Sequence, residues 1–162
     1  MSSVRLRTAR EDDYPTVASS LERWWDDRPV MMMLPQLFFR HFAATSLVAE
    51  QQDHLVGFLI GFPSPAVPAE AHTHFIGVDP ALRAQGVGGQ MYLAFFDIAR
   101  TNGCDAVTAV TSVGNVASQN FHLRMGFTAL PAPDGGQVWP DWDGPGQHRV
   151  RFRREIPPCE RA

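Results

Sequence analysis

The segment 72-HTHFIGVDPALRAQGVGGQMYLAFFDIART-101 determines the fold that this sequence predicts. Residues 72–78 form a short β-like run, which Asp79 and Pro80 end. Residues 86–101 begin with glycines and continue with apolar side chains at helical spacing, with Met91, Leu93 and Phe95 expected on the inner side. The segment therefore predicts a strand, a glycine-rich turn and a helix.

The segments on either side extend this pattern over the whole chain. Thr8 and Glu11 resemble a capping box for a first helix, and Gln52-Asp53 suits the turn of a hairpin. The expected strands and helices are listed in chain order: strand 4–7, helices 14–25 and 34–44, strands 46–51, 55–62 and 72–78, helix 86–101, strand 106–111, helix 115–125, and strands 127–130 and 150–156. This order predicts an α/β fold with a mixed sheet of about seven strands and about four helices. We expect one domain over residues 1–162, with a loose tail at 157–162.

Composition excludes several functions. The 162 residues are 44% hydrophobic and 19% charged, with a net charge of −3, so we expect neither a nucleic-acid nor a membrane partner. All 14 basic residues are Arg, which excludes a Schiff-base lysine and a Walker phosphate loop. Cys104 and Cys159 make neither a disulfide framework nor a metal spacing, and the N-terminus lacks an apolar signal segment. We therefore expect a cytoplasmic protein without a metal site.

The glycine-rich turn is suited to a phosphate ligand. Glycines let a backbone approach a ligand closely, and a helix start offers unpaired N–H groups and a positive dipole end. Arg83 adds a charged donor. A dinucleotide-binding fingerprint would need Gly at Met91, so the predicted anion site is of another kind. The alternative is that these glycines only form a turn.

Two motifs resemble those of the GNAT superfamily of N-acetyltransferases. The first is Arg83-Ala84-Gln85-Gly86-Val87-Gly88 after a strand that ends at Val78. The second is Asn115, with a ring residue seven positions on at His122 and Gly126-Phe127 at the helix end. The resemblance covers roughly residues 4–156. It implies a GNAT fold in which two splayed strands hold the cofactor, which would be acetyl-CoA.

The resemblance also implies roles for particular residues. The turn would bind the pyrophosphate, the strand end would bind the pantetheine arm and the acetyl carbonyl, and Ser118 is a weaker candidate near the thiol. The implied cofactor-binding residues are Ile76, Gly77, Val78, Arg83, Ala84, Gln85, Gly86, Val87, Gly88, Gly89, Asn115 and Ser118.

Three histidines are the candidate catalytic residues. By strand alternation His72 and His74 share a side with Ile76 and Val78, and either could accept the proton of an attacking amine. The alternative is a pair of hydrogen-bonded structural histidines. His122 stands where many family members have Tyr, which leaves its role as the acid for the thiolate in doubt.

Aromatic and acidic residues in two loops could bind a cationic acceptor. Trp25, Arg28 and Asp143 are the weak candidates, with Trp139 and Trp142 beside them in sequence. In the alternative interpretation, the tryptophans anchor loops and the aspartates form turns.

The predicted function is transfer of an acetyl group from acetyl-CoA to an amine by direct attack in a ternary complex. The acceptor would be a small molecule or a peptide, and the family's habit favours a homodimer. Two alternatives stay open: a non-catalytic acyl-CoA sensor, and an acyltransferase that uses a longer acyl-CoA.

Overall fold

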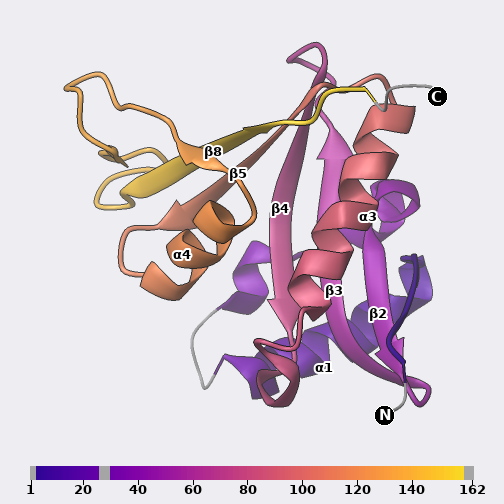
Figure 1. Ribbon diagram of the computed structural model, residues 1–162. Coiled ribbons are helices and arrows are strands. Elements are labelled where there is room, and N and C mark those ends of the chain that lie inside the picture. The colour runs from indigo at the N-terminus through magenta and orange to yellow at the C-terminus, as the bar shows by residue number, and fades with distance from the viewer. Residues whose placement is uncertain (1–2, 26–29, 159–162) are drawn as a thin grey trace. The chain divides into compact units, whose positions relative to one another are not determined.

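The computed structural model describes residues 3–25 and 30–158. Its contacts group the chain into two compact units, Met1–Phe62 with His74–Ile98, and Pro63–Thr73 with Ala99–Ala162. Strand β4 (Glu70–Val78) contributes residues to both units (Figure 1). The expectation of one domain over the whole chain stays a prediction, and residues 159–162 of the expected tail lie outside the described residues.

In the first unit the strands follow the order β1-β2-β3-β4. Strand β1 (Arg5–Thr8) pairs antiparallel with β2 (Leu47–Gln51), and β2 pairs antiparallel with β3 (His54–Pro63). The predicted hairpin turn is confirmed, because Gln52 and Asp53 adopt φ angles of 51° and 60° at the β2–β3 connection. Such left-handed conformations are what a tight hairpin turn requires.

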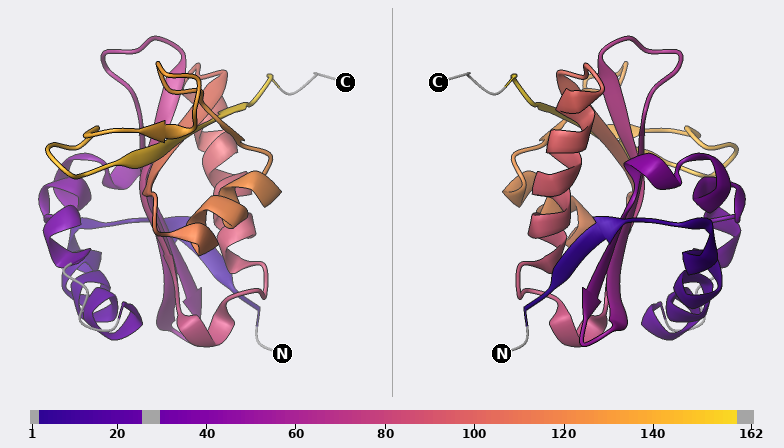
Figure 2. Two further views of the ribbon diagram at one scale, coloured as in Figure 1. Left: turned by 90° about the vertical axis from the view of Figure 1, so that its left-hand side faces the viewer. Right: turned by 90° about the vertical axis from the view of Figure 1, so that its right-hand side faces the viewer.

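Helices cover both faces of these strands. Helix α1 (Tyr14–Trp24) lies on one face and helix α3 (Val87–Thr101) on the other, as the edge-on views show (Figure 2). A Cβ placed on Gly57 or Gly61 of β3 would meet Met91 or Phe95 of α3, which identifies the α3 face of the strand. Leu93 of α3 is 58% exposed, so its predicted place on the inner side of the helix is wrong.

The predicted helix 34–44 is wrong in its extent. In this range the structure has α2 (Leu37–His41), which a 3-10 turn at Ala43–Thr45 follows, and a further 3-10 turn at Val30–Met33 precedes the range. Two physical features shorten the helix. Pro35 has no N–H to donate, and the hydroxyls of Thr45 and Ser46 bond to the Phe42 carbonyl.

The first helix also begins differently from the prediction. Thr8 belongs to β1, and the carboxylate of Asp13, not that of Glu11, accepts the Arg10 N–H at 2.7 Å. A 3-10 turn at Glu11–Asp13 therefore precedes α1. Arg7 bonds both Asp13 and Glu50, so this ion-pair cluster ties the start of α1 to β1 and β2.

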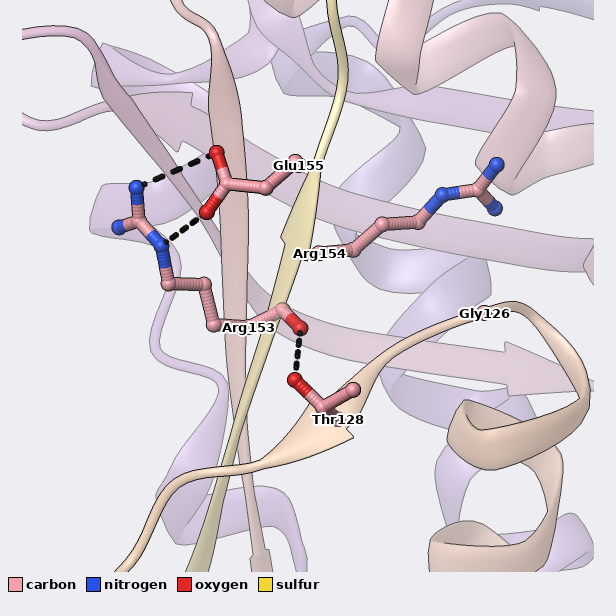
Figure 3. A pocket seen from close by; sticks show the side chains of 5 residues that line it. All are labelled: Gly126, Thr128, Arg153, Arg154 and Glu155. Carbon is pink, nitrogen blue, oxygen red and sulfur yellow. Dashed lines mark hydrogen bonds and ion pairs between the residues drawn. The ribbon is translucent and has the colours of Figure 1, made fainter.

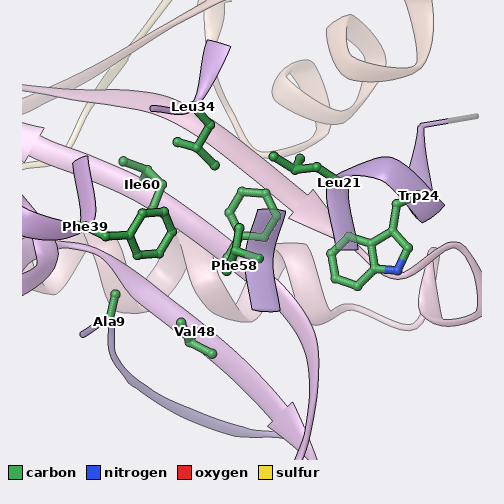
Figure 4. Packing of buried hydrophobic residues seen from close by; sticks show 9 residues of the cluster. Ala9, Leu21, Trp24, Leu34, Phe39, Val48, Phe58 and Ile60 are labelled. Carbon is green, nitrogen blue, oxygen red and sulfur yellow. The ribbon is translucent and has the colours of Figure 1, made fainter. Parts of the chain in front are cut away.

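The core of the first unit lies between α1, α2 and the sheet. Phe58 of β3 is fully buried and stacks on Trp24 at 6.2 Å between ring centroids (Figure 4). The buried members of this cluster are Ala9, Val17, Leu21, Trp24, Leu34, Phe39, Val48, Phe58 and Ile60. Large apolar side chains buried in this way supply most of the stabilisation of such a unit.

The second unit is built around β8 (Arg149–Glu155), which pairs antiparallel with β5 (Ala106–Ser112). On its other side β8 pairs with β6 (Thr128–Ala129) and β7 (Val138–Trp139), and β7 lies between the expected strands 127–130 and 150–156, where no strand was expected. Helix α4 (Val116–Arg124) follows β5. The register of the parallel β4–β5 pair runs from Glu70↔Ala106 to Thr73↔Ala109.

The described residues thus form a mixed α/β fold with four α-helices and eight strands, close to the predicted composition. Among them, no helix is long and apolar enough to cross a membrane.

Candidate active site

The glycine-rich turn is an exposed connection between β4 and α3. Asp79 ends β4 and accepts the Ala81 N–H at 2.9 Å, which starts a 3-10 turn over Pro80–Leu82. Ala84 and Gly86 then adopt φ angles of 65° and 85° on either side of Gln85. Backbone turns of this kind direct successive N–H groups outward, and α3 adds the unpaired N–H groups of its first turn. The predicted turn and its helix are both confirmed in outline.

Arg83 is held against the ends of two other elements. Its Nε donates to the Val78 carbonyl at 3.2 Å, and its Nη2 donates to the Trp24 carbonyl at 3.3 Å. Its Cζ lies 5.7 Å from the centre of the Trp25 ring. The side chain is exposed, and its other N–H donors are available to an anion at the turn.

Trp25 packs within the first unit. Its ring meets Phe75 edge-on at 5.5 Å and lies beside Trp24 at 6.4 Å. These contacts match the alternative interpretation, in which the tryptophan anchors its loop. The candidate Arg28 lies outside the described residues, so its predicted role stays a prediction.

Strand β4 breaks its own alternation at His74 and Phe75. Phe75 packs on Phe58 and Trp25, and a Cβ on Gly77 would meet those same two rings. His74 stacks on Phe38, which also packs against this cluster, at 4.0 Å between ring centroids. Two successive side chains on one face are typical of a β-bulge.

This break corrects one prediction. His74, Phe75 and Gly77 share the α1 face, so alternation sends Ile76 to the opposite face. The expectation that His74 lies on the same side as Ile76 and Val78 is therefore wrong. The backbone of residues 76–78 still ends the strand beside the turn, where the predicted cofactor contacts remain a prediction.

The ring of His74 has a defined tautomer. Its Nε2 lies 2.6 Å from the Met33 carbonyl oxygen, and because a carbonyl can only accept, Nε2 carries the proton. Nδ1 is then the acceptor atom of the ring. The contacts with Met33 and Phe38 fix the ring against the α2 layer.

His72 belongs to a polar chain in the second unit. Its Nδ1 lies 2.9 Å from Thr108 Oγ1, and Thr108 donates to Glu70 at 3.3 Å. Glu70 in turn accepts from Arg153 at 2.8 Å. When the Thr108 hydroxyl donates to Glu70, it accepts from Nδ1–H of His72, and Nε2 becomes the basic atom.

Sequence reasoning missed Glu70 and Thr108. A signal existed for Glu70, because it lies two residues before His72 and so shares its strand face. Thr108 could not be found in this way, since its place opposite His72 follows from the parallel register of β4 and β5.

His122 is a packing residue in this structure. It is 3% exposed, stacks on Phe152 at 5.2 Å and meets Phe127 edge-on at 5.3 Å. Its Nδ1 donates to the Ser118 carbonyl at 2.8 Å. Removal from solvent lowers the pKa of His122 below its ordinary value, which outweighs the hydrogen bond to Ser118. A neutral ring with Nδ1–H has no proton on Nε2 to give to a thiolate, so the acid role is disfavoured.

Asn115 caps helix α4. Its side-chain oxygen accepts the Ser118 N–H at 3.1 Å, as an N-cap residue does. The hydroxyl of Ser118 lies 3.4 Å from His122 Nδ1. Both residues therefore have structural contacts within α4, and their predicted contacts with a cofactor stay predictions.

The loop tryptophans and Asp143 surround arginines of β8. Asp143 accepts from Arg149 at 2.6 Å, as the alternative interpretation of these loops allows. The guanidinium of Arg151 lies 4.4 Å from the centre of the Trp139 ring and 4.0 Å from that of Trp142. The predicted aromatic site for a cation is thus taken by the protein's own arginine.

A polar hollow in the second unit contains none of the predicted residues. It is lined by Gly126, Thr128, Arg153, Arg154 and Glu155 (Figure 3). Arg153 pairs with Glu155 at 2.7 Å, and Arg154 donates to the Met125 carbonyl at the end of α4. The polar side chains of the hollow thus have partners within the protein, and we assign the hollow no function.

Comparison with known proteins identifies the family. The sequence profile of the acetyltransferase (GNAT) family matches residues 5–127, about three quarters of the chain. The chain therefore belongs to the GNAT acetyltransferase family.

Two curated relatives share one activity in their names. L-2,4-Diaminobutyric acid acetyltransferase of Nocardia farcinica (strain IFM 10152) is 30% identical over 115 residues, which are 67% of this chain and 59% of that protein. The enzyme of the same name from Virgibacillus pantothenticus is 30% identical over 84 residues, 52% of this chain and 53% of that protein. The chain spans little more than half the length of these relatives.

A solved structure shows the same fold. Diaminobutyrate acetyltransferase from Paenibacillus lautus, in complex with L-2,4-diaminobutyric acid and coenzyme A, superimposes with a TM-score of 0.76 at 18% identity. The match covers 96% of this chain and 96% of that one. At this identity the likeness establishes the fold alone.

Proposed function

We propose that this protein is an acetyl-CoA-dependent N-acetyltransferase that acetylates a primary amine of a small molecule. The observation that carries the proposal is the exposed turn from Arg83 to Gly86 at the start of α3, in a chain of the GNAT family. The two relatives named as diaminobutyric acid acetyltransferases support an amine as acceptor.

The turn fits the pyrophosphate of coenzyme A. A Cβ on Gly86 would meet no atom within 4 Å, so the space over this backbone is open. The N–H groups at the start of α3 and the remaining donors of Arg83 would bind the phosphates. The backbone of residues 76–78 would bind the pantetheine arm. When bound, acetyl-CoA supplies a thioester whose acyl carbon accepts the amine.

His72 is the residue that we assign as the general base. An amine must lose a proton as it attacks, and an imidazole nitrogen can accept that proton near neutral pH. The chain from Arg153 through Glu70 and Thr108 orients the ring and favours Nε2 as the basic atom. His74 Nε2 donates to the Met33 carbonyl, and we assign His74 the role of holding Met33.

Cys104 is not a suitable nucleophile for a covalent route. Its thiol is buried, and desolvation raises the pKa of Cys104 above its ordinary value, with Asp105 and Glu70 adding to the effect. This supports direct attack by the amine rather than transfer through an acyl-enzyme.

The test is thiol release from acetyl-CoA with a panel of diamines, amino acids and short peptides. His72→Gln should lower kcat by about 100-fold, and His74→Gln, the matched control, should retain most of the activity. Thr108→Val should lower kcat by less than His72→Gln does, because it removes the relay while leaving the base in place.

The outcomes separate the candidate functions. Turnover that survives His72→Gln but is lost in His74→Gln would reverse the assignment of the base. Thiol release from a longer acyl-CoA but not from acetyl-CoA would change the donor. If no acceptor in the panel causes thiol release, but acetyl-CoA still raises the melting temperature, the result would support the non-catalytic sensor.

A further inference from the structure

Three arginines alternate along one face of strand β8, and their partners differ. Arg149 bonds the carboxylate of Asp143, and Arg153 bonds those of Glu70 and Glu155. The guanidinium of Arg151, between them, has no hydrogen-bond or ion-pair partner among residues 3–25 and 30–158, whereas its main-chain carbonyl accepts the Leu130 N–H. It is therefore the arginine of this face whose charge no carboxylate balances.

The guanidinium of Arg151 is nevertheless held in place. Its Cζ lies 4.4 Å and 4.0 Å from the ring centres of Trp139 and Trp142, and these two rings meet nearly at right angles, 77° apart. Trp139 is itself fixed, because its Nε1 donates to the Leu130 carbonyl at 3.1 Å. Contact with ring faces leaves the N–H edges of a guanidinium for other groups, and a planar fork of N–H donors matches a carboxylate.

Arg151 and His72 lie on the same face of the second unit's sheet. His72 is paired with Thr108, Thr108 with Arg153, and Arg151 with Val110, two positions further along β5. β4 and β8 are two strand spacings apart, and Arg151 is offset from His72 by two residues along the strands. Together these separations place the two Cα atoms about 12 Å apart. A small molecule that spans this distance on this face would meet both side chains.

We infer that Arg151 binds a carboxylate of the acceptor, so that the acceptor is an amino acid that carries a reactive amine. This inference rests on the proposed acetyltransferase function and narrows its substrate class. Trp139 and Trp142 orient the guanidinium and exclude water from one side of it, which strengthens a charge-assisted hydrogen bond. Diamines without a carboxylate leave the Arg151 charge unbalanced and are poor substrates.

The competing explanation is that Arg151 only holds the loop of Trp139 and Trp142 by cation–π contact. Such contacts stabilise proteins, and they require no ligand. The two explanations differ in one respect: a structural arginine affects all acceptors equally, whereas a carboxylate-binding arginine affects only acceptors that carry a carboxylate.

Matched acceptor pairs test the inference. L-2,4-Diaminobutyric acid, L-ornithine and L-lysine are compared with their decarboxylated counterparts 1,3-diaminopropane, putrescine and cadaverine, in the wild-type protein and in Arg151→Gln. We expect kcat/KM of the wild type to favour the carboxylated member of at least one pair by about 100-fold. Arg151→Gln abolishes this preference by lowering kcat/KM for the amino acid only.

Arg149→Gln is the matched control, since Arg149 lies on the same face but already has carboxylate and amide partners. It should retain the preference for the amino acid. Arg151→Lys keeps the positive charge but not the planar fork of N–H donors, and should retain part of the preference that Arg151→Gln loses. Equal use of both members of every pair by the wild type overturns the inference, and so does a preference that survives in Arg151→Gln.

A binding measurement separates this inference from the proposed function. Calorimetry with the amino acids alone, without acetyl-CoA, should show binding to the wild type and weaker binding to Arg151→Gln. If no acceptor is acetylated but this difference is found, the enzyme proposal fails and the carboxylate site stands. If neither turnover nor binding is found, both proposals fail.

Discussion

Gly77 is a residue whose missing side chain makes room for two aromatic rings. A Cβ at this position would lie 2.8 Å from Phe58 Cε1 and 2.8 Å from Trp25 Cη2. Both rings are packed against others, so neither can move away without cost. Gly77→Ala should therefore lower the free energy of unfolding by about 1–3 kcal/mol, measured by urea denaturation.

Gly114→Ala is the control for this prediction. A Cβ on Gly114 would meet no atom within 4 Å, and its φ is not in the left-handed region. The free energy of unfolding of Gly114→Ala should stay within about 0.5 kcal/mol of that of the wild type. Equal stabilities of the two variants would contradict the packing of Phe58 and Trp25 on β4.

At the scale of the element, helix α4 depends on the residue that caps its N-terminus. Asn115 accepts the Ser118 N–H, and replacing such a cap by alanine costs about 1 kcal/mol. We expect Asn115→Ala to destabilise the protein by this amount in thermal or urea unfolding. Asn115→Asp keeps the accepting oxygen and should be nearly as stable as the wild type.

The same pair of variants tests the cofactor contact that the family resemblance implies. If Asn115 also binds acetyl-CoA through its amide, Asn115→Asp should raise the KM for acetyl-CoA while leaving stability unchanged. An unchanged KM would restrict Asn115 to its role in α4.

Local signals made several elements predictable from the sequence. Asp79-Pro80, the glycines of residues 86–89 and Asn102-Gly103 fix the bounds of α3 because each acts on its own stretch of backbone. The turn over residues 83–86 followed from the same residues, and its binding of a pyrophosphate stays a prediction. The prediction of a helix over residues 34–44 was wrong because Pro35 lacks an N–H donor and the hydroxyls of Thr45 and Ser46 compete with helical hydrogen bonds.

The parts of the candidate site that the sequence did not predict depend on distant residues. The break in β4 at His74 follows from the packing of Phe38 and Phe58, which alternation within the strand cannot foresee. The relay from Glu70 through Thr108 to His72 requires the parallel register of two strands. The contacts of Arg151 with Trp139 and Trp142 depend on the pairing of β7 with β8, which no local signal in the sequence shows.

The stability of the whole molecule should fall with pH in two stages. Burial lowers the pKa of His122 below 6.5, so the folded state binds its proton less readily than the unfolded state. The hydrogen bond from Arg7 lowers the pKa of Glu50. Burial by itself would raise the pKa of Asp13, but hydrogen bonds from Arg7 and Arg10 outweigh burial and lower it. In all three cases the unfolded state binds protons first, and acid removes stability.

We expect the free energy of unfolding to decrease first as pH falls below about 6.5, and again below about 4.5. His122→Phe keeps an aromatic ring beside Phe152 and should flatten the first stage, whereas Asp13→Asn should weaken the second. Urea denaturation between pH 7.5 and pH 3.5 measures both. A His122→Phe variant with the wild-type slope between pH 7 and pH 5 would show that this histidine is not the cause.

The pair of indoles around Arg151 also gives the protein an optical reporter. Indole emission responds to nearby charge, and Trp139 and Trp142 both contact the guanidinium that we expect a carboxylate to neutralise. The other two tryptophans, Trp24 and Trp25, belong to the first unit and provide a steady background in the same spectrum. Tryptophan fluorescence can therefore follow the arrival of an acceptor without any label, and a Trp142→Phe variant assigns the signal to its source.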